Sequence, residues 1–97
     1  MTVARHITLT SFSGSITAGG TAQTALAANA KRKFLWLQNP PSSSENVSFD
    51  LDGTAVGDGT DITLEPGAAI GFDTAVPAGA VSVIAATTGT KFIVKEG

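Results

Sequence analysis

Four aspartates crowd into one acidic stretch of the chain, SFDLDGTAVGDGTDI at residues 48–62. Their carboxylates could do two kinds of chemistry, namely nucleophilic or acid–base catalysis and the binding of a hard cation through oxygen. Asp and Gly at strand ends also form tight turns without any ligand. The aspartates concerned are Asp50, Asp52, Asp58 and Asp61.

A calcium loop of the EF-hand type does not fit this stretch. Such a loop needs a glycine and a bidentate glutamate where, counting from Asp50, the chain has Ala55 and Asp61. The segment GDGTDIT matches one turn of a glycine-rich calcium repeat, but those sites form between stacked copies. We therefore expect the aspartates to shape turns, to hold no metal, and to form an exposed acidic edge after a strand.

The two halves of the stretch, Asp-x-Asp-Gly-Thr and Gly-Asp-Gly-Thr-Asp, resemble signature motifs of the haloacid dehalogenase phosphatases. The resemblance implies Asp50 as nucleophile, Asp52 as general acid/base and the later acids as magnesium ligands. These roles need neighbouring parallel strands, which are joined by a crossover of about a dozen residues or more. Only residues 55–57 separate Thr54 from Asp58, enough for a hairpin and too few for a crossover. We expect that the chain is not an enzyme, with a metal-dependent phosphatase as the remote alternative.

The other residues that could carry chemistry stand alone. His6 is the only histidine and there is no cysteine, so neither a transition-metal site nor a cofactor is expected. The triplet Lys31, Arg32 and Lys33 could contact phosphate, but no extended basic patch with interleaved aromatic residues surrounds it. We expect the triplet in a solvated turn or at a partner contact, with no binding to nucleic acid.

Length and composition describe one small domain. The chain of 97 residues is 42% hydrophobic and 14% charged and contains 11 glycines, which is typical of a globular domain rich in turns. No apolar run approaches the roughly 20 residues of a transmembrane helix, so no membrane partner is expected. Seven of the eight acids lie between residues 45 and 73, where no Lys or Arg occurs. This asymmetry suits a solvated surface or complementary surfaces on neighbouring subunits.

The hydrophobic periodicity predicts strands. Apolar and polar residues alternate in segments such as HITLT (6–10) and VSFDLD (47–52), and turn sequences separate them at short intervals. The alanine-rich segment TAQTALAANAKRK (21–33) has no apolar stripe at helical spacing. We therefore expect a strand at 21–27 and a turn at 28–31. The predicted fold is all-β: a compact antiparallel β-sandwich or jelly-roll-like barrel of about seven or eight short strands, with residues 1–5 as a possible N-terminal arm.

The segment KFLWLQ is apolar on both of its faces. Phe34 and Trp36 share one face, and Leu35 and Leu37 share the other. Such a strand is either covered on both sides or has one face against a neighbouring chain. We expect Trp36 to lie in the core or at a subunit interface. The expected interface residues are Trp36, Ile93 and the basic triplet.

The order of the segments resembles a type of short β-rich protein found among the structural proteins of tailed bacteriophages. The resemblance covers most of the chain and rests on strands and turns rather than on a catalytic motif. It consists of a polar strand with Gln23, a turn with Asn29 and Arg32, an apolar strand at 35–39, a Leu-x-Pro-Gly turn at 64–67 and a closing hairpin at 81–95.

This resemblance implies a virion component assembled in the host cytoplasm. We expect a decoration or cement protein that binds the major capsid protein as a homo-oligomer, with a trimer favoured, because a small chain gains stability by oligomerising. The alternative is a tail or fibre accessory module that binds a host glycan. A glycan-binding module is expected to expose stacking aromatic rings in its loops, whereas the aromatic residues of this chain lie mostly in strand patterns.

Overall fold

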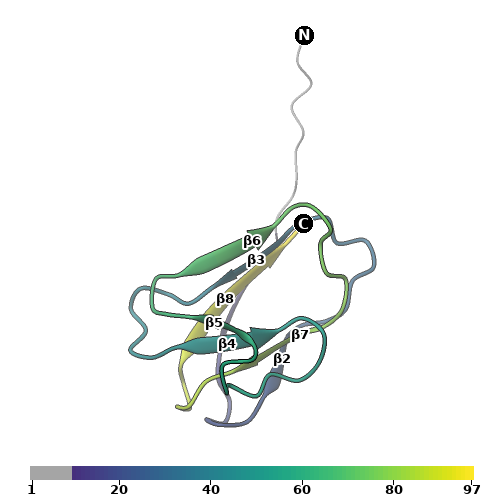
Figure 1. Cartoon of the computed structure of the whole chain (residues 1–97). Helices are drawn as coiled ribbons and strands as arrows, with labels where there is room; N and C mark the ends of the chain where they lie inside the picture. Colours follow the sequence, from purple (N-terminus) through teal and green to yellow (C-terminus); the bar gives the residue numbers. More distant parts are fainter. Residues whose placement is uncertain (1–9) are drawn as a thin grey trace.

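The computed structural model describes residues 10–97, which form two antiparallel sheets packed face to face (Figure 1). Within these residues there are eight strands and no helix, and therefore no helix that could cross a membrane. The predicted all-β sandwich is confirmed. His6, the possible arm at residues 1–5 and most of the strand predicted at 6–10 lie outside the described residues. The strands are β1 (Thr10–Ser15), β2 (Gln23–Leu26), β3 (Leu35–Gln38), β4 (Val47–Asp50), β5 (Ile62–Leu64), β6 (Ala69–Phe72), β7 (Val81–Ile84) and β8 (Lys91–Glu96).

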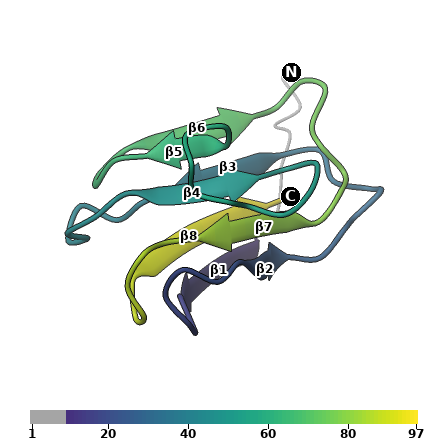
Figure 2. The ribbon, with the colours of Figure 1, turned by 60° about the horizontal axis from the view of Figure 1, so that its bottom comes forward.

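The strand pairs are nested along the chain. β1 pairs with β8, β2 with β7, β3 with β6 and β4 with β5, all antiparallel. The chain is thus one long hairpin, closed at β4 and β5, whose successive pairs alternate between two sheets (Figure 2). The sheet orders that result are β1-β8-β3-β6 and β2-β7-β4-β5. This topology is that of a jelly roll, as predicted, with two separate sheets rather than a barrel.

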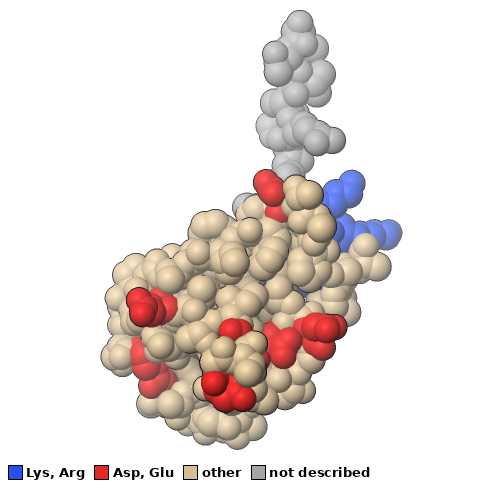
Figure 3. All heavy atoms as spheres, in the orientation of Figure 1, with Lys and Arg blue, Asp and Glu red and all other residues tan. Residues whose placement is uncertain are grey.

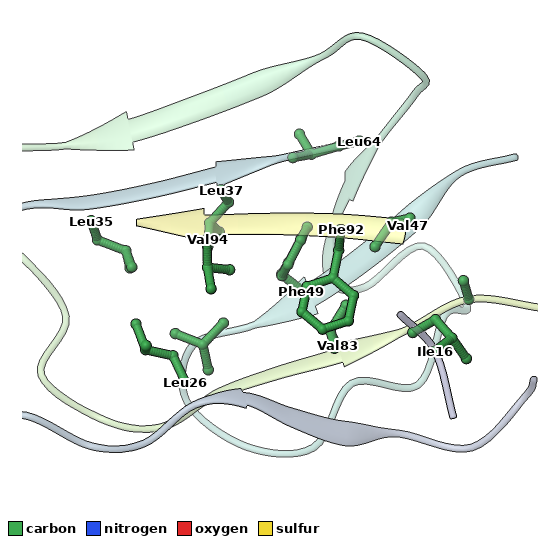
Figure 4. Close-up of a cluster of buried hydrophobic side chains, with 12 residues drawn as sticks. Ile16, Leu26, Leu35, Leu37, Val47, Phe49, Leu64, Val83, Phe92 and Val94 are labelled. Carbon is green, nitrogen blue, oxygen red and sulfur yellow. The ribbon is translucent and has the colours of Figure 1, made fainter. Parts of the chain in front are cut away.

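Strand alternation sends one set of apolar side chains between the sheets. Leu35 and Leu37 of β3 are fully buried, as is Val94, which lies opposite Leu37 on β8. Phe49 and Phe92 come from different sheets and meet edge to face, with ring centroids 6.5 Å apart (Figure 4). Burial of each such side chain contributes about 1.5–3 kcal/mol, so this layer is the main source of stability.

The alanine-rich segment behaves as its lack of a helical stripe predicted. β2 occupies Gln23–Leu26, inside the expected strand, and a turn follows. In that turn the Asn29 side-chain oxygen accepts the backbone N–H of Lys31 at 3.0 Å, and the backbone N–H of Arg32 donates to the Asn29 carbonyl at 3.1 Å. Asn favours such turns because its side chain bonds the backbone two residues on.

The loop between β3 and β4 is tied down at both ends. Asn39 is fully buried, and its Nδ2 donates to the carbonyls of Glu45 and Leu64 at 2.8 and 2.9 Å. The Glu45 carboxylate accepts the Thr90 hydroxyl at 2.6 Å and the N–H and hydroxyl of Thr87, each at 2.9 Å. The hydrogen bonds from Thr90 and then Thr87 lower the pKa of Glu45 below its ordinary value of 4.5. The ionised carboxylate of Glu45 therefore joins this loop to the β7–β8 turn by accepting these hydrogen bonds.

Replacement of Glu45 by Gln is expected to reduce stability at neutral pH and to flatten its dependence on acid. Because the folded-state pKa is lowered, the stability that Glu45 contributes is present above about pH 4.5 and is lost as the pH falls through the folded-state pKa. Urea unfolding at neutral pH and at about pH 3 measures the difference. Glu65→Gln, which removes an exposed carboxylate from the β5–β6 turn, is the control. An unchanged pH response in Glu45→Gln would contradict this role.

Candidate interaction surface

The side of the β1-β8-β3-β6 sheet that faces away from the core gathers two of the predicted interface residues. Since Leu35 and Leu37 point inward, Trp36 and Gln38 point outward. The strand register places Lys95 opposite Trp36 and Ile93 opposite Gln38, and opposite residues share a face. We call this surface the basic face. Its strand residues are Ser11, Ser13, Ser15, Trp36, Gln38, Ala69, Gly71, Lys91, Ile93 and Lys95.

The side chain of Trp36 can pack against the neighbouring strand β6 because the residue opposite it there is a glycine. Gly71 of β6 faces Trp36, and a Cβ at Gly71 would lie 3.0 Å from Cε3 and 3.3 Å from Cζ3 of the indole. The six-membered ring thus covers Gly71, and the indole N–H donates to Oε1 of Gln38 at 3.3 Å. Trp36 is half-buried and belongs to the sheet surface rather than to the core. Its ring offers apolar area that is already held in one orientation.

Charge differs between the two sides of the sandwich. Lys91 and Lys95 lie on the basic face, and none of its strand residues is acidic. Among residues 10–97, the side with β4 and β5 in front carries acidic groups across its surface and basic groups only at one rim (Figure 3). The uneven charge distribution of the sequence therefore becomes a difference between two surfaces.

The acidic stretch forms a loop (residues 51–61, the acidic loop) that folds back over the second sheet. β4 and β5 pair as an antiparallel hairpin on either side of it, so the hairpin predicted from the spacing of the two motifs is confirmed. Ala55 is only 2% exposed, and its N–H donates to Oγ of Ser82 on β7 at 3.0 Å. A Cβ on Gly57 would lie 3.3 Å from Cγ2 of Ile84, so the loop passes close to the sheet.

The carboxylates of this stretch hold the acidic loop in shape. Oδ2 of Asp61 accepts the backbone N–H groups of Val56 and Gly57, both at 2.8 Å. Oδ1 of Asp50 accepts the N–H of Asp52 at 2.8 Å, which fixes the turn that follows β4. These are the turn roles that the sequence predicted for Asp residues at strand ends.

Asp58 bonds within its own turn as well. The side chain and then the backbone N–H of Thr60 donate to it, and these hydrogen bonds lower the pKa of Asp58 below its ordinary range. In residues 10–97 no three carboxylate, histidine or cysteine side chains are placed so that they could hold a metal ion. The carboxylates of Asp50, Asp58 and Asp61 thus have a conformational role within the part of the chain that the structure describes.

A groove of about 570 Å³ lies between the acidic loop and the second sheet. Ser48, Thr63 and Ile84 line it, with Val56 as an exposed rim residue. The hydroxyls of Ser48 and Thr63 form a hydrogen bond at 3.1 Å. The carboxylate of Glu45, which also lines the groove, accepts hydrogen bonds from Thr87 and Thr90. The side chains of Ser48, Thr63 and Glu45 in the lining therefore already have hydrogen-bond partners.

Arg32 is buried, so its predicted place in a solvated turn or at a partner contact is wrong. Its side chain is 0% exposed and lies between the ends of the two sheets. Nε bonds Oε1 of Glu96 at 2.9 Å, Nη1 donates to the carbonyls of Pro77 and Gly79 at 2.6 and 3.0 Å, and Nη2 donates to that of Ala27 at 2.9 Å. One signal in the sequence could have found this pair: Glu96 is the single acid outside residues 45–73.

The remaining predicted interface residues divide between two places. Lys31 and Lys33 are exposed on the turn before β3, whereas Trp36 and Ile93 lie half-buried on the basic face. The structure therefore does not bring all five predicted residues together. It adds Lys91 and Lys95, whose alternation with Ile93 in the last strand was the signal that places them on the same face.

The fold and this surface define a small jelly-roll β-sandwich with one basic, aromatic sheet face and one acidic side. No protein-family model, curated protein or solved structure matches the chain.

Proposed function

We propose that the protein is a structural component of a bacteriophage virion that decorates the capsid and docks on it through the basic face. The observation that carries this proposal is that Ile93 lies between Lys91 and Lys95 on one sheet face and Trp36 lies opposite Lys95, with no acid among the strand residues of this face. The complementary partner surface is apolar and acidic. In such an arrangement the aromatic residue supplies binding energy, and the charged residues steer association and fix orientation.

The fold supports the same proposal by analogy. Jelly rolls recur in viral capsid proteins and also in lectins, so the topology fits a virion component without selecting it over a glycan-binding module. The order of strands and turns, which resembles that of phage structural proteins, favours the virion. The preformed surface also suits docking, since Trp36 is already fixed against Gly71 and loses little freedom on binding.

Binding to capsids that lack the protein provides the test. Wild-type protein is expected to co-sediment with such capsids at a high and fixed copy number, and binding is expected to weaken as salt screens the lysines. Lys91→Glu/Lys95→Glu should abolish binding. Lys31→Glu/Lys33→Glu, which makes the same charge change on the turn before β3, should bind as the wild type does.

Two outcomes would contradict the proposal. Saturation at only a few copies per particle would place the protein on the tail or a fibre instead. Loss of binding in the Lys31/Lys33 variant, with binding retained in the Lys91/Lys95 variant, would assign the contact to the turn. Thermal unfolding of each variant shows whether a loss of binding follows from a loss of fold.

A further inference from the structure

The four edge strands of the sandwich differ in how they are protected from pairing with other strands. β2 contains a register shift between Thr24 and Leu26, which is a bulge or irregularity, and β5 is only three residues long. β6 has four residues and is followed by Asp73. Short length, bulges and charge are the usual means by which proteins blunt an edge.

β1 has none of these protections. It is six residues long, TSFSGS, with no charged residue and no proline. Its register with β8 is regular over its whole length, from Thr10 opposite Glu96 to Ser15 opposite Lys91. Within residues 10–97 β1 pairs only with β8, so one side of a regular and uncharged strand has no strand partner there. Such an edge is a template for another strand.

Phe12 marks the same edge independently. The register places it opposite Val94, which is fully buried, so Phe12 points toward the core side of the sheet. It is nevertheless 41% exposed, because it stands at the open border of the sandwich, where β1 lies beside β2 (Figure 2). A strand added along β1 would cover the open flank of this ring.

The chemistry of β1 favours a second copy of itself as this strand. Two β1 strands that meet antiparallel across a twofold axis bring no like charges together, and the contact is closed and self-complementary. A register centred on Ser13 puts Phe12 of each copy opposite Gly14 of the other. Phe92 of the same copy already lies over Gly14, so Phe12 of the other copy would lie beside this glycine rather than over it.

We propose that β1 pairs antiparallel with β1 of a second copy, so that two four-stranded sheets become one continuous sheet across a dimer. The pairing places two basic faces side by side, which would give a capsid-bound dimer two linked contacts. It does not depend on the proposed function, because it concerns the protein alone. It replaces the trimer expected from the sequence with a twofold assembly.

The pairing is tested by the mass of the protein in solution and by charged substitutions at Ser13. At about 100 µM, where a weak dimer is populated, light scattering should give twice the mass of the chain. Ser13 is exposed and lies on the basic face opposite Ile93, so a substitution there leaves the core intact. At low salt, Ser13→Lys and Ser13→Glu should each raise the dissociation constant of the dimer several-fold above that of the wild type. A mixture of the two variants should form the heterodimer preferentially.

Cysteine cross-linking tests the register, which is straightforward because the chain contains no cysteine. In the register centred on Ser13, two Ser13→Cys copies face each other and should form a disulfide under mild oxidation. Ser11→Cys alone should not cross-link, whereas Ser11→Cys mixed with Ser15→Cys should. Ser42→Cys, in the exposed loop after β3, reports random collision.

Several results would overturn the pairing. A wild type that stays monomeric at this concentration would show that β1 does not recruit a second copy, and a trimer would show that another surface assembles the chain. A dimer that is insensitive to both Ser13 charge variants and does not cross-link at Ser13 would place its interface elsewhere. None of these results bears on capsid binding, which is measured separately by co-sedimentation.

Discussion

Replacement of Arg32 by alanine is expected to lower the free energy of unfolding by about 3–5 kcal/mol, the usual effect of removing one partner of a buried ion pair. The guanidinium is 0% exposed and joins Glu96 to three backbone carbonyls. Those carbonyls follow β2 and precede β7 in one sheet, whereas Glu96 ends β8 in the other. Without Arg32, three carbonyls lose this donor and the Glu96 carboxylate keeps only the hydrogen bond from Nδ2 of Asn29, all at the same end of the sandwich. Urea unfolding at neutral pH measures the change.

Three variants separate the possible causes of this effect. Arg32→Lys keeps the charge but cannot reproduce the fork geometry, so it should remain clearly less stable than the wild type. Arg32→Met/Glu96→Met replaces both charges by apolar groups and should be closer to the wild type than Arg32→Ala, since a buried pair can be exchanged for apolar residues at small cost. Lys33→Ala, on the same turn and exposed, should change stability by less than about 0.5 kcal/mol. A loss below about 1 kcal/mol in Arg32→Ala would mean that this cluster contributes little.

Arg32 also shows where a local interpretation of the sequence stops. Between Lys31 and Lys33 its residue type gives no sign of burial, because the groups that surround it come from residues 27, 77, 79 and 96 and meet only in the folded chain. The same holds for the nested pairing of the strands. Strand alternation predicted the strands, but it left open which face of the segment with Leu35 and Leu37 points to the core, and it carries no information about which strand is the neighbour.

The candidate surfaces divide in the same way. Periodicity put Trp36 on the opposite side of its strand from Leu35 and Leu37, without saying which side faces the core. It also puts Lys91, Ile93 and Lys95 on one face. That these two sets form a single surface follows from the β3–β8 register, which is a long-range contact. The acidic stretch was correctly predicted as a hairpin connection, but its return over the second sheet depends on Ser82, 27 residues from its partner Ala55.

The contact between Gly14 and Phe92 leads to the second large expected effect. Gly14→Val should lower the free energy of unfolding by about 3 kcal/mol, toward the upper end of the range for overpacking. The ring of Phe92 lies directly over Gly14, so that a Cβ there would overlap Cζ of the ring. The ring has little room to move, because Phe92 is buried and also meets Phe49 in the edge-to-face contact. Valine has a high intrinsic preference for strands, so a loss of stability would come from packing rather than from backbone propensity.

A double-mutant cycle identifies the cause of this loss. Phe92→Leu removes the ring that occupies the space above Gly14. Gly14→Val should then cost less in the Phe92→Leu background than in the wild type, with a coupling free energy of about 0.5–3 kcal/mol. Gly53→Ala is the matched control, since a Cβ on Gly53 meets nothing closer than the Asp50 carboxylate at 3.6 Å. If Gly14→Val lowers the free energy of unfolding equally in the wild type and in Phe92→Leu, the Phe92 ring is not what opposes the valine. The need for glycine would then lie in the backbone of β1, where it would also affect the pairing proposed for that edge.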